Sequence, residues 1–302
     1  EHGPAGAGRQ ARRYADSPLS SLIRKKTGFT LARVYSTPAI ARADRGLSMT
    51  RRVVFNQKGG VGKTTLLCNL AAIAAARGKR TLVIDLDAQC NASQYLLSSD
   101  NRQAEAGSAD FFESTLSRAR TGSNLADYIT PSPFENLSVM AAHPDLEELR
   151  IKLEAKHKIY KLKQSLARLH DYDAIFIDTP PALNFYSQSA LIAAERCLVP
   201  FDCDDFARQA LYSLFDNIHE IQDDHNPDLV IDGIVVNQFQ ARAKLPERML
   251  AELKAEGHPL IETRITSSIK VRESHDASIP LIHYAPSHKV TQQLIALYER
   301  LD

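Results

Sequence analysis

The sequence lacks the long apolar run that a membrane-spanning helix requires. Its longest candidates are strands of five or six residues, far short of the roughly 20 apolar residues that cross a bilayer. The four cysteines include no C-x-x-C pair, so we expect free thiols in a reducing cytosol. His275, His283 and His288 lack metal-ligand spacing. They are expected to be surface or core residues that can add positive charge below neutral pH.

A strong excess of basic residues is also missing, because the net charge of the whole chain is +1. Residues 1–48 carry nine Lys/Arg against three Asp/Glu, so the remainder is net negative and has no global basic footprint for nucleic acid. This segment shows no sustained hydrophobic period, and we predict a disordered basic extension. Its composition is similar to that of an organelle transit peptide. Met49, just before the first expected strand, favours instead an upstream extension of the reading frame.

The most informative segment that is present is residues 58–65, K-G-G-V-G-K-T-T, which follows an apolar stretch. Three glycines in four positions let successive backbone N–H groups face one anion. The helix expected to begin at Lys63 points its positive end at the same place. In such a loop Lys63 reaches the β- and γ-phosphates of a nucleotide, and the Thr64 hydroxyl binds Mg²⁺.

Two further apolar segments end in carboxylates. Residues 81–87 deliver Asp85 and Asp87, and residues 174–178 end in Asp178, which is followed by prolines. Ligands of open parallel sheets bind beyond the carboxyl ends of the strands. Asp178 is therefore predicted to hold Mg²⁺, directly or through water.

The loop departs from the general pattern G-x-x-x-x-G-K-[ST], because Gln57 occupies the position of the first glycine. Its sequence K-G-G-x-G-K-T resembles the deviant Walker A box of the ParA/MinD family of ATPases, and the preceding Asn56-Gln57 resembles the ParA branch. Residues 81–89 resemble the D-x-D-P-Q box of that family, with Ala88 in place of proline. Residues 172–181 resemble its Walker B segment.

The resemblance implies ATP and Mg²⁺ as ligands and assigns the site residues. Residues 230–237 resemble the strand whose terminal asparagine contacts adenine, here Asn237. The expected ATP-binding residues are Lys58, Gly59, Gly60, Val61, Gly62, Lys63, Thr64, Thr65 and Asn237. Those expected at Mg²⁺ are Thr64, Asp85 and Asp178, with Asp85 supporting the ion and its waters. The expected catalytic residues are Lys58, Lys63 and Asp87, with Asp87 orienting the attacking water.

In this family two subunits close face to face over two ATP molecules, and Lys58 of each would reach the phosphates held by the other. A cation from the partner subunit suits the charge that develops on the transferring phosphoryl group. The resemblance thus implies an ATP-dependent homodimer and a slow, partner-stimulated ATPase. The stimulating partner would be a ParB-like or cargo-adaptor protein.

Apolar patterns that alternate along the chain predict an α/β fold: a doubly wound, mostly parallel sheet with helices on both faces, in a single domain over residues 49–302. The expected strands are 51–56, 81–86, 137–142, 174–178, 196–201 and 230–236. The expected helices are 63–77, 146–170, 205–223, 245–256, 268–276 and 288–300.

Two basic clusters are candidates for DNA contact. The first comprises Arg264, Lys270, Arg272 and Lys289, in segments where the family binds DNA without sequence preference; Arg242 and Lys244 match another basic family position. The second is the expected helix 146–170, whose cations would lie opposite an apolar stripe. Those cations are Arg150, Lys152, Lys156, Lys158, Lys161, Lys163 and Arg168, and the stripe is Ile159, Leu162, Leu166 and Leu169. A solvated helix face would explain this second pattern equally well.

The sequence therefore predicts a cytoplasmic ParA-like ATPase, nucleoid-associated when ATP-bound, that positions DNA or another large cargo. Residues 1–48 are too short for a helix-turn-helix domain, so operator binding is not expected. A MinD-type membrane ATPase is one alternative and would need a basic amphipathic helix at the C-terminus. The apolar stripe there is expected to be core packing, without stable membrane association; it comprises Val290, Leu294, Leu297, Tyr298 and Leu301. An ATP-dependent amidoligase or synthetase of the same fold is the other alternative.

Overall fold

The structure is a computed structural model that describes residues 49–97, 106–117, 124–202, 207–239 and 244–302. The expected basic extension at residues 1–48 and the candidate DNA-contacting Arg242 lie outside the described residues. Predictions about these segments stay predictions.

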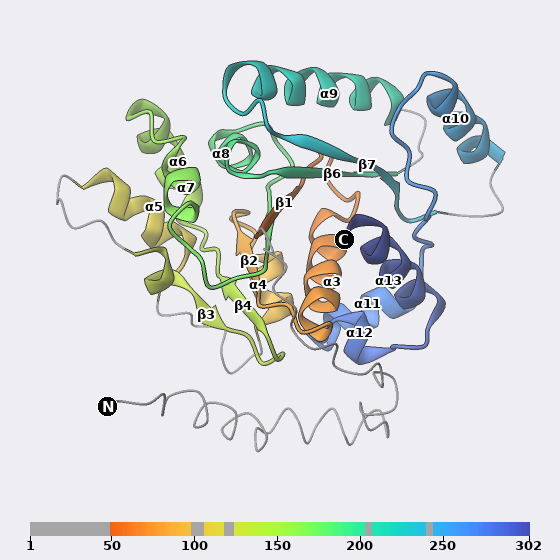
Figure 1. The fold of residues 1–302 in the computed structure, drawn as a ribbon, viewed down its shortest axis with the longest axis horizontal. Helices are drawn as coiled ribbons and strands as arrows, with labels where there is room; N and C mark the ends of the chain where they lie inside the picture. Colours follow the sequence, from red (N-terminus) through yellow and green to blue (C-terminus); the bar gives the residue numbers. More distant parts are fainter. Residues whose placement is uncertain (1–48, 98–105, 118–123, 203–206, 240–243) are drawn as a thin grey trace, which may run out of the picture. The chain divides into compact units, whose positions relative to one another are not determined.

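Seven strands of the described residues form one sheet (Figure 1). They are β1 (Thr50–Val54), β2 (Thr81–Asp85), β3 (Thr130–Pro131), β4 (Leu137–Met140), β5 (Ala174–Asp178), β6 (Arg196–Phe201) and β7 (Val230–Val236). The order across the sheet is β3-β4-β2-β5-β1-β6-β7, and every pair is parallel except β3 with β4. The chain places β2 and β4 on one side of β1 and later places β6 and β7 on the other. The strand order thus reverses around β1, which is where such sheets bind ligands.

Helices cover both faces of this sheet, as predicted. They are α3 (Lys63–Ala76), α4 (Asn91–Leu96), α5 (Ser108–Leu116), the 3₁₀ helix η3 (Leu125–Tyr128), α6 (Leu146–Ala155), α7 (Lys161–Leu166), α8 (Phe185–Ala193), α9 (Ala207–Asp224), α10 (Lys244–Ala255), α11 (Ile269–Asp276), α12 (Leu281–Tyr284) and α13 (Lys289–Leu301). Figure 1 shows α3, α11, α12 and α13 together on one side of the sheet, and α6, α7, α8 and α9 on the other.

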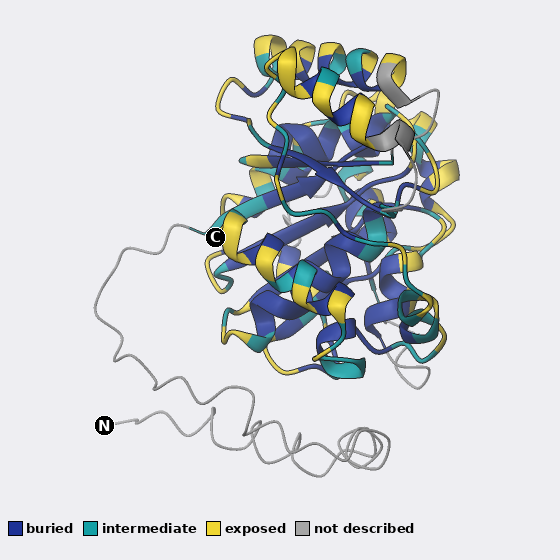
Figure 2. Ribbon diagram, turned by 90° about the vertical axis from the view of Figure 1, so that its right-hand side faces the viewer, coloured by how far each residue is buried: buried dark blue, intermediate teal, exposed yellow. Residues whose placement is uncertain are grey.

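The central strands are buried on both faces, which explains why they are continuous apolar runs in the sequence. All five residues of β2 and of β5 are buried. Helix α3 is almost entirely buried as well, because it lies between the sheet and the C-terminal helices α12 and α13. Figure 2 shows the buried strands in dark blue between helices whose outer faces are exposed.

The six expected strands are present. Three have the expected bounds, and the ends of the other three differ by one or two residues. The expected continuous helix 146–170 is wrong, because the chain forms α6 and α7 with a break between them. His157 adopts a left-handed conformation with φ of 52°, and the amide of Lys158 donates to the carbonyl of Leu153 at 3.1 Å. This pattern closes a helix C-terminus. Neither glycine nor proline marks the break in the sequence.

The apolar stripe of the C-terminal helix packs inward. Val290, Leu294, Leu297 and Tyr298 are buried, and α13 lies against α3. Polar contacts join α13 to the body of the fold: the Arg52 guanidinium donates to the carbonyl of Leu301 at 2.9 Å. No helix among the described residues is long and apolar enough to span a membrane.

Candidate nucleotide-binding site

The loop between β1 and α3 has the conformation that anion binding requires. Gly60 and Gly62 have φ of 77° and 82°, a left-handed region that side chains disfavour. A Cβ atom at Gly62 would lie 2.4 Å from Nδ2 of Asn237, so glycine is also required there by space. At the start of the loop, the Asn56 side chain donates to the Pro200 carbonyl at 2.7 Å and accepts from the Lys58 amide at 2.9 Å. Asn56 thus ties the loop to β6.

Lys63 is buried at the first position of α3. Its Nζ atom donates to the carbonyl oxygen of Lys58 at 3.1 Å, which folds the side chain back over the loop. Burial lowers the pKa of Lys63, while the charges of Asp178 and Asp87 act to raise it. An anion bound in the loop would add charge partners for this desolvated ammonium group. The arrangement fits a phosphate-binding lysine.

The end of β7 forms the facing wall of the loop. Nδ2 of Asn237 donates to the carbonyl of Val61 at 2.8 Å, and Nε2 of Gln238 donates to the carbonyl of Gly60 at 2.6 Å. The structure thus brings the expected residue Asn237 to the loop. Sequence reasoning missed Gln238, although its place directly after Asn237 at a strand end is the signal that could have found it.

Asp178 and Thr64 form the part of the site that suits a cation. The Thr64 hydroxyl donates to Oδ2 of Asp178 at 2.7 Å. Oδ1 of Asp178 is buried, with no hydrogen-bond partner among the described residues. Burial, together with the charge of Asp85, raises the pKa of Asp178 to about 8. A buried carboxylate in this environment is stabilised by a bound cation.

This donor set fits Mg²⁺. The described residues contain no cluster of three His, Cys, Asp or Glu side chains that could hold a metal ion. Mg²⁺ is commonly held by one or two protein oxygens and takes its other ligands from phosphate and water. Thr64 and Asp178 are therefore the residues that could hold the ion.

The carboxylate of Asp85 has different hydrogen-bond partners from that of Asp178, its neighbour in the sheet. Its Oδ2 accepts from the backbone amide of Ser93 at 2.9 Å and from the Ser93 hydroxyl at 2.7 Å, and its Oδ1 accepts from the Asp87 amide at 3.1 Å. Burial raises the pKa of Asp85 to about 6, against the effect of these hydrogen bonds. Asp85 thus anchors α4, and it has less capacity than Asp178 to bind a cation directly.

These elements enclose a cleft of about 420 Å³, within the size range of small-molecule sites. The phosphate loop and Asp87 line this cleft. Asp87 is buried, and its Oδ1 accepts from the Gln89 amide at 3.0 Å. Val271 and Arg272 of α11, with its N-cap residue Ser268, contribute to the lining. Sequence reasoning placed Arg272 only in the basic cluster, so its position at the cleft is a finding of the structure.

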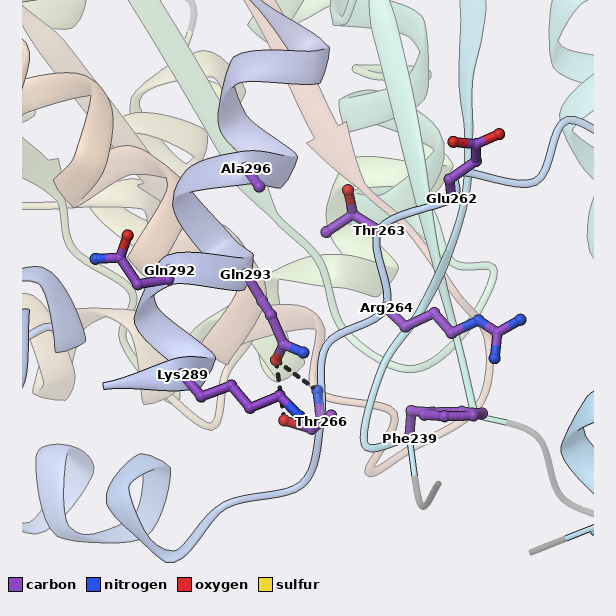
Figure 3. Close-up of a pocket in the computed structure, with 9 residues that line it drawn as sticks. All are labelled: Phe239, Glu262, Thr263, Arg264, Thr266, Lys289, Gln292, Gln293 and Ala296. Carbon is purple, nitrogen blue, oxygen red and sulfur yellow. Dashed lines mark hydrogen bonds between the residues drawn. The ribbon is translucent and has the colours of Figure 1, made fainter. Parts of the chain in front are cut away.

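The basic residues of the C-terminal cluster are divided between two places. Arg264 and Lys289 line a shallow hollow beside α13 (Figure 3). Arg264 pairs with Glu247 at 2.5 Å and lies over the Phe239 ring, 4.7 Å from its centroid. Figure 3 shows Arg264 extending over that ring, whereas Lys289 lies beside Thr266.

Lys270 and Arg272 lie on α11. Lys270 pairs with Glu273 at 2.6 Å, and Arg272 is exposed. Lys244 begins α10, but the placement of its side chain is not described. Arg264 and Lys270 thus already have acidic neighbours, which reduces the charge that they can offer to a polyanion.

Burial opposes a positive charge on two histidines near this cluster. Burial lowers the pKa of His275 and brings that of His283 down to about 4. His283 stacks on Phe134 with ring centroids 5.0 Å apart. The expectation of positive charge just below neutral pH fails for His283, and burial works against it for His275, because both rings are desolvated.

Comparisons with known proteins agree with this site. Residues 49–231 match the family described as an AAA domain. The chain is 30% identical over 269 residues to the chromosome partitioning protein ParA of Myxococcus xanthus, covering 87% of this chain and 92% of that protein.

Two solved structures share the fold. One is cobyrinic acid a,c-diamide synthase from Mycobacterium smegmatis with an ATP analogue and magnesium, at 26% identity and a TM-score of 0.66, covering 80% of this chain and 98% of that one. The other is the septum site-determining protein MinD of Pyrococcus horikoshii with Mg-ADP, at 25% identity and a TM-score of 0.68, covering 84% and 96%. The chain therefore belongs to the ParA branch of the ParA/MinD family of P-loop ATPases, whose ligands are ATP and Mg²⁺.

Proposed function

We propose that this protein is a ParA-like ATPase whose ATP-bound dimer binds DNA without sequence preference and positions DNA or another large cargo. The observation that carries the proposal is a second lysine, Lys58, at the entrance of the phosphate loop. Lys58 is partly exposed, and the next residues, Gly59 and Gly60, are exposed. Within the loop, Lys63 already occupies the position of the ordinary phosphate-binding lysine. At this entrance, Lys58 would face the phosphates of a second subunit that closes over the cleft.

In the proposed ATP hydrolysis, each group of cleft residues has a separate role. Backbone amides of the loop and the Lys63 ammonium group hold the phosphates. Thr64 and Asp178 hold Mg²⁺, which supplies charge neutralisation at the phosphates. Asp87 orients the attacking water, and Lys58 of the partner subunit stabilises the charge that develops on the transferring group. Asp85 supports this arrangement by fixing the position of α4.

Dimerisation would present each basic residue twice. Two copies of a weak DNA-binding surface bind with avidity, because the second contact becomes intramolecular. ATP then controls DNA affinity through the dimer, and hydrolysis stimulated by a ParB-like or cargo-adaptor protein releases the DNA. In the cell we expect the protein in the cytoplasm, and on the nucleoid when ATP is bound.

The test is a salt titration of a fluorescent DNA duplex with and without ATP and Mg²⁺. Binding is expected only with ATP and equally to unrelated sequences. Its affinity should fall with a logarithmic slope of about −0.9 for each phosphate neutralised. Removing residues 1–48 is expected to leave this behaviour in place, because the proposed surface lies outside them. Binding that is independent of ATP would contradict the proposal.

Asp87→Ala is expected to trap the ATP-bound dimer. Loss of the carboxylate that orients water slows the chemical step by about 10²- to 10⁴-fold, while the loop and Lys63 still hold the phosphates. ATP turnover and dimer lifetime, measured by phosphate release and light scattering, check this. Hydrolysis at the parent rate, both alone and with the stimulating partner, would show that another residue orients the water.

The similarity to cobyrinic acid a,c-diamide synthase keeps an ATP-dependent amidoligase as a second candidate. Such an enzyme would hydrolyse ATP only with a carboxylic acid substrate and an amine donor, and DNA would have no effect on it.

A MinD-type membrane function fits less well, because the apolar face of α13 packs against α3. Anionic liposomes, included beside the duplex in the titration, separate this alternative. Liposome binding without ATP-dependent DNA binding would favour it.

A further inference from the structure

An imidazole on helix α11 contacts the first turn of the phosphate-binding helix α3. Nε2 of His275, near the end of α11, lies 3.0 Å from the Thr65 hydroxyl, at the third position of α3. Thr65 immediately follows Thr64, the hydroxyl that pairs with Asp178. One hydrogen bond thus joins the helix that carries Lys270 and Arg272 to the first turn of the phosphate-binding helix.

The His275 ring is held in place by a second contact. It stacks on Tyr95 of α4 with ring centroids 4.0 Å apart and ring planes within 9° of each other. The Tyr95 hydroxyl lies 2.9 Å from the Ser274 hydroxyl, again on α11. Tyr95 and Ser274 are buried. The imidazole therefore has one defined position, with its Nε2 directed at Thr65.

The same network reaches the carboxylate side of the site. Tyr95 lies two residues after Ser93, which donates two hydrogen bonds to Asp85. Asn69 of α3 donates to the Thr65 carbonyl at 2.8 Å and accepts from the Leu281 amide, which follows α11, at 2.8 Å. A displacement of α3 or α4 would therefore change the position of α11, because the loss of any one hydrogen bond in a buried polar network is costly.

We propose that His275 is a positioning residue that transmits nucleotide occupancy from the phosphate loop to α11. Nucleotide in the cleft would fix Thr65 and the first turn of α3. His275 would then hold α11, and with it Lys270 and Arg272, in the orientation that contacts DNA. Helix α11 also borders the cleft through Val271, Arg272 and its N-cap residue Ser268, so a movement of the loop would reach α11 directly. The part of this inference that concerns DNA rests on the proposed function.

Two substitutions separate the hydrogen bond from the stacking. His275→Phe keeps an aromatic ring on Tyr95 but has no nitrogen for Thr65. His275→Gln loses the ring but offers an amide at the position of Nε2. His283→Phe is a matched control, since His283 is also a desolvated imidazole stacked on an aromatic ring and lies on α12, outside the nucleotide cleft.

The first measurement is the gain in DNA affinity that ATP confers. His275→Phe is expected to bind ATP within about twofold of the parent, while its ATP-dependent gain falls by about tenfold, a typical coupling between two sites. His275→Gln should recover part of that gain, and His283→Phe should retain all of it. The inference is overturned if His275→Phe keeps the ATP-dependent gain in DNA affinity of the parent. It is also overturned if His275→Phe keeps this gain and His275→Gln loses it, because the stacked ring, and not the hydrogen bond, would then matter.

The second measurement does not involve DNA. Amide hydrogen exchange of residues 269–276 is followed with and without a non-hydrolysable ATP analogue. The parent and His283→Phe should gain protection in α11 when the analogue binds, whereas His275→Phe should bind the analogue without that gain. Equal protection in the parent and in His275→Phe would overturn the inference. If the parent shows ATP-dependent protection of α11 but does not bind DNA, the proposed DNA function is contradicted, while the coupling between the nucleotide site and α11 is supported.

Discussion

Lys63→Ala is expected to weaken ATP binding by about 100-fold, whereas Lys58→Ala is expected to leave ATP binding by the single subunit nearly unchanged and to prevent ATP-dependent dimerisation. The Lys63 ammonium group is buried and desolvated, with carboxylates nearby. Charge-assisted hydrogen bonds are worth about 1.5–3 kcal/mol, so its loss should weaken ATP binding by about 100-fold. Removal of the side chain also leaves Asp178 with less positive charge beside it.

Lys58 contributes to the loop through its backbone, because its carbonyl oxygen accepts the hydrogen bond from Lys63. The alanine variant retains that carbonyl and the amide that binds Asn56, so the loop should keep its conformation. ATP binding is measured by equilibrium titration, and dimerisation by light scattering with a non-hydrolysable ATP analogue. Normal dimerisation of Lys58→Ala would overturn the arrangement in which each subunit reaches into the other. A loss of ATP binding equal to that of Lys63→Ala would show that both lysines serve the same subunit.

The phosphate loop could be predicted because its chemistry is local. The conformation needs glycine at Gly60 and Gly62, the lysine and threonine follow at once, and the apolar run before them is a buried strand. The same holds for Asp85, Asp87 and Asp178, each of which ends or follows a strand of the parallel sheet. In such folds the end of a strand and the position of the site coincide.

Contacts between distant segments could not be predicted in this way. His275 and Thr65 are separated by 210 residues, and the histidine has neither metal-ligand spacing nor a catalytic motif. The position of Arg272 at the cleft depends on how α11 packs against α3 and α4. The two oxygens of Asp85 are occupied by α4, and nothing in the strand sequence distinguishes this acid from Asp178. The helix break at His157 likewise depends on a left-handed residue that is not glycine.

These contacts change how the basic cluster should be tested. Arg272 borders the nucleotide cleft, so its replacement can alter ATP binding as well as DNA binding. Arg264 is tied to Glu247, so its replacement also frees an acid. Lys270 and Lys289 lie on α11 and at the start of α13, and neither lines the nucleotide cleft. Replacing Lys270 also frees an acid, Glu273, but it does not disturb the cleft.

A double charge reversal, Lys270→Glu with Lys289→Glu, is expected to remove ATP-dependent DNA binding while ATP-dependent dimerisation and basal ATPase activity persist. Each subunit loses two cations and gains two anions, and the dimer doubles the change. Loss of a phosphate contact lowers the salt slope by about 0.9, so the affinity should fall by at least tenfold at moderate salt. The reversal at Lys270 places like charges beside Glu273, which costs only about 0.2–0.5 kcal/mol on an exposed helix.

The matched control is Lys152→Glu with Lys158→Glu, which makes the same change of charge on the second basic cluster. Lys152 is an exposed residue of α6, and Lys158 lies in the break before α7. If α11 and α13 contact DNA, the control should lower affinity only slightly, through net charge. This reduction in affinity should be the same with and without ATP, because an effect of net charge acts at long range and is screened by salt. Loss of DNA binding in the control, with retention in the double reversal at Lys270 and Lys289, would move the DNA surface to α6 and α7. It would also remove the reason for coupling α11 to the nucleotide.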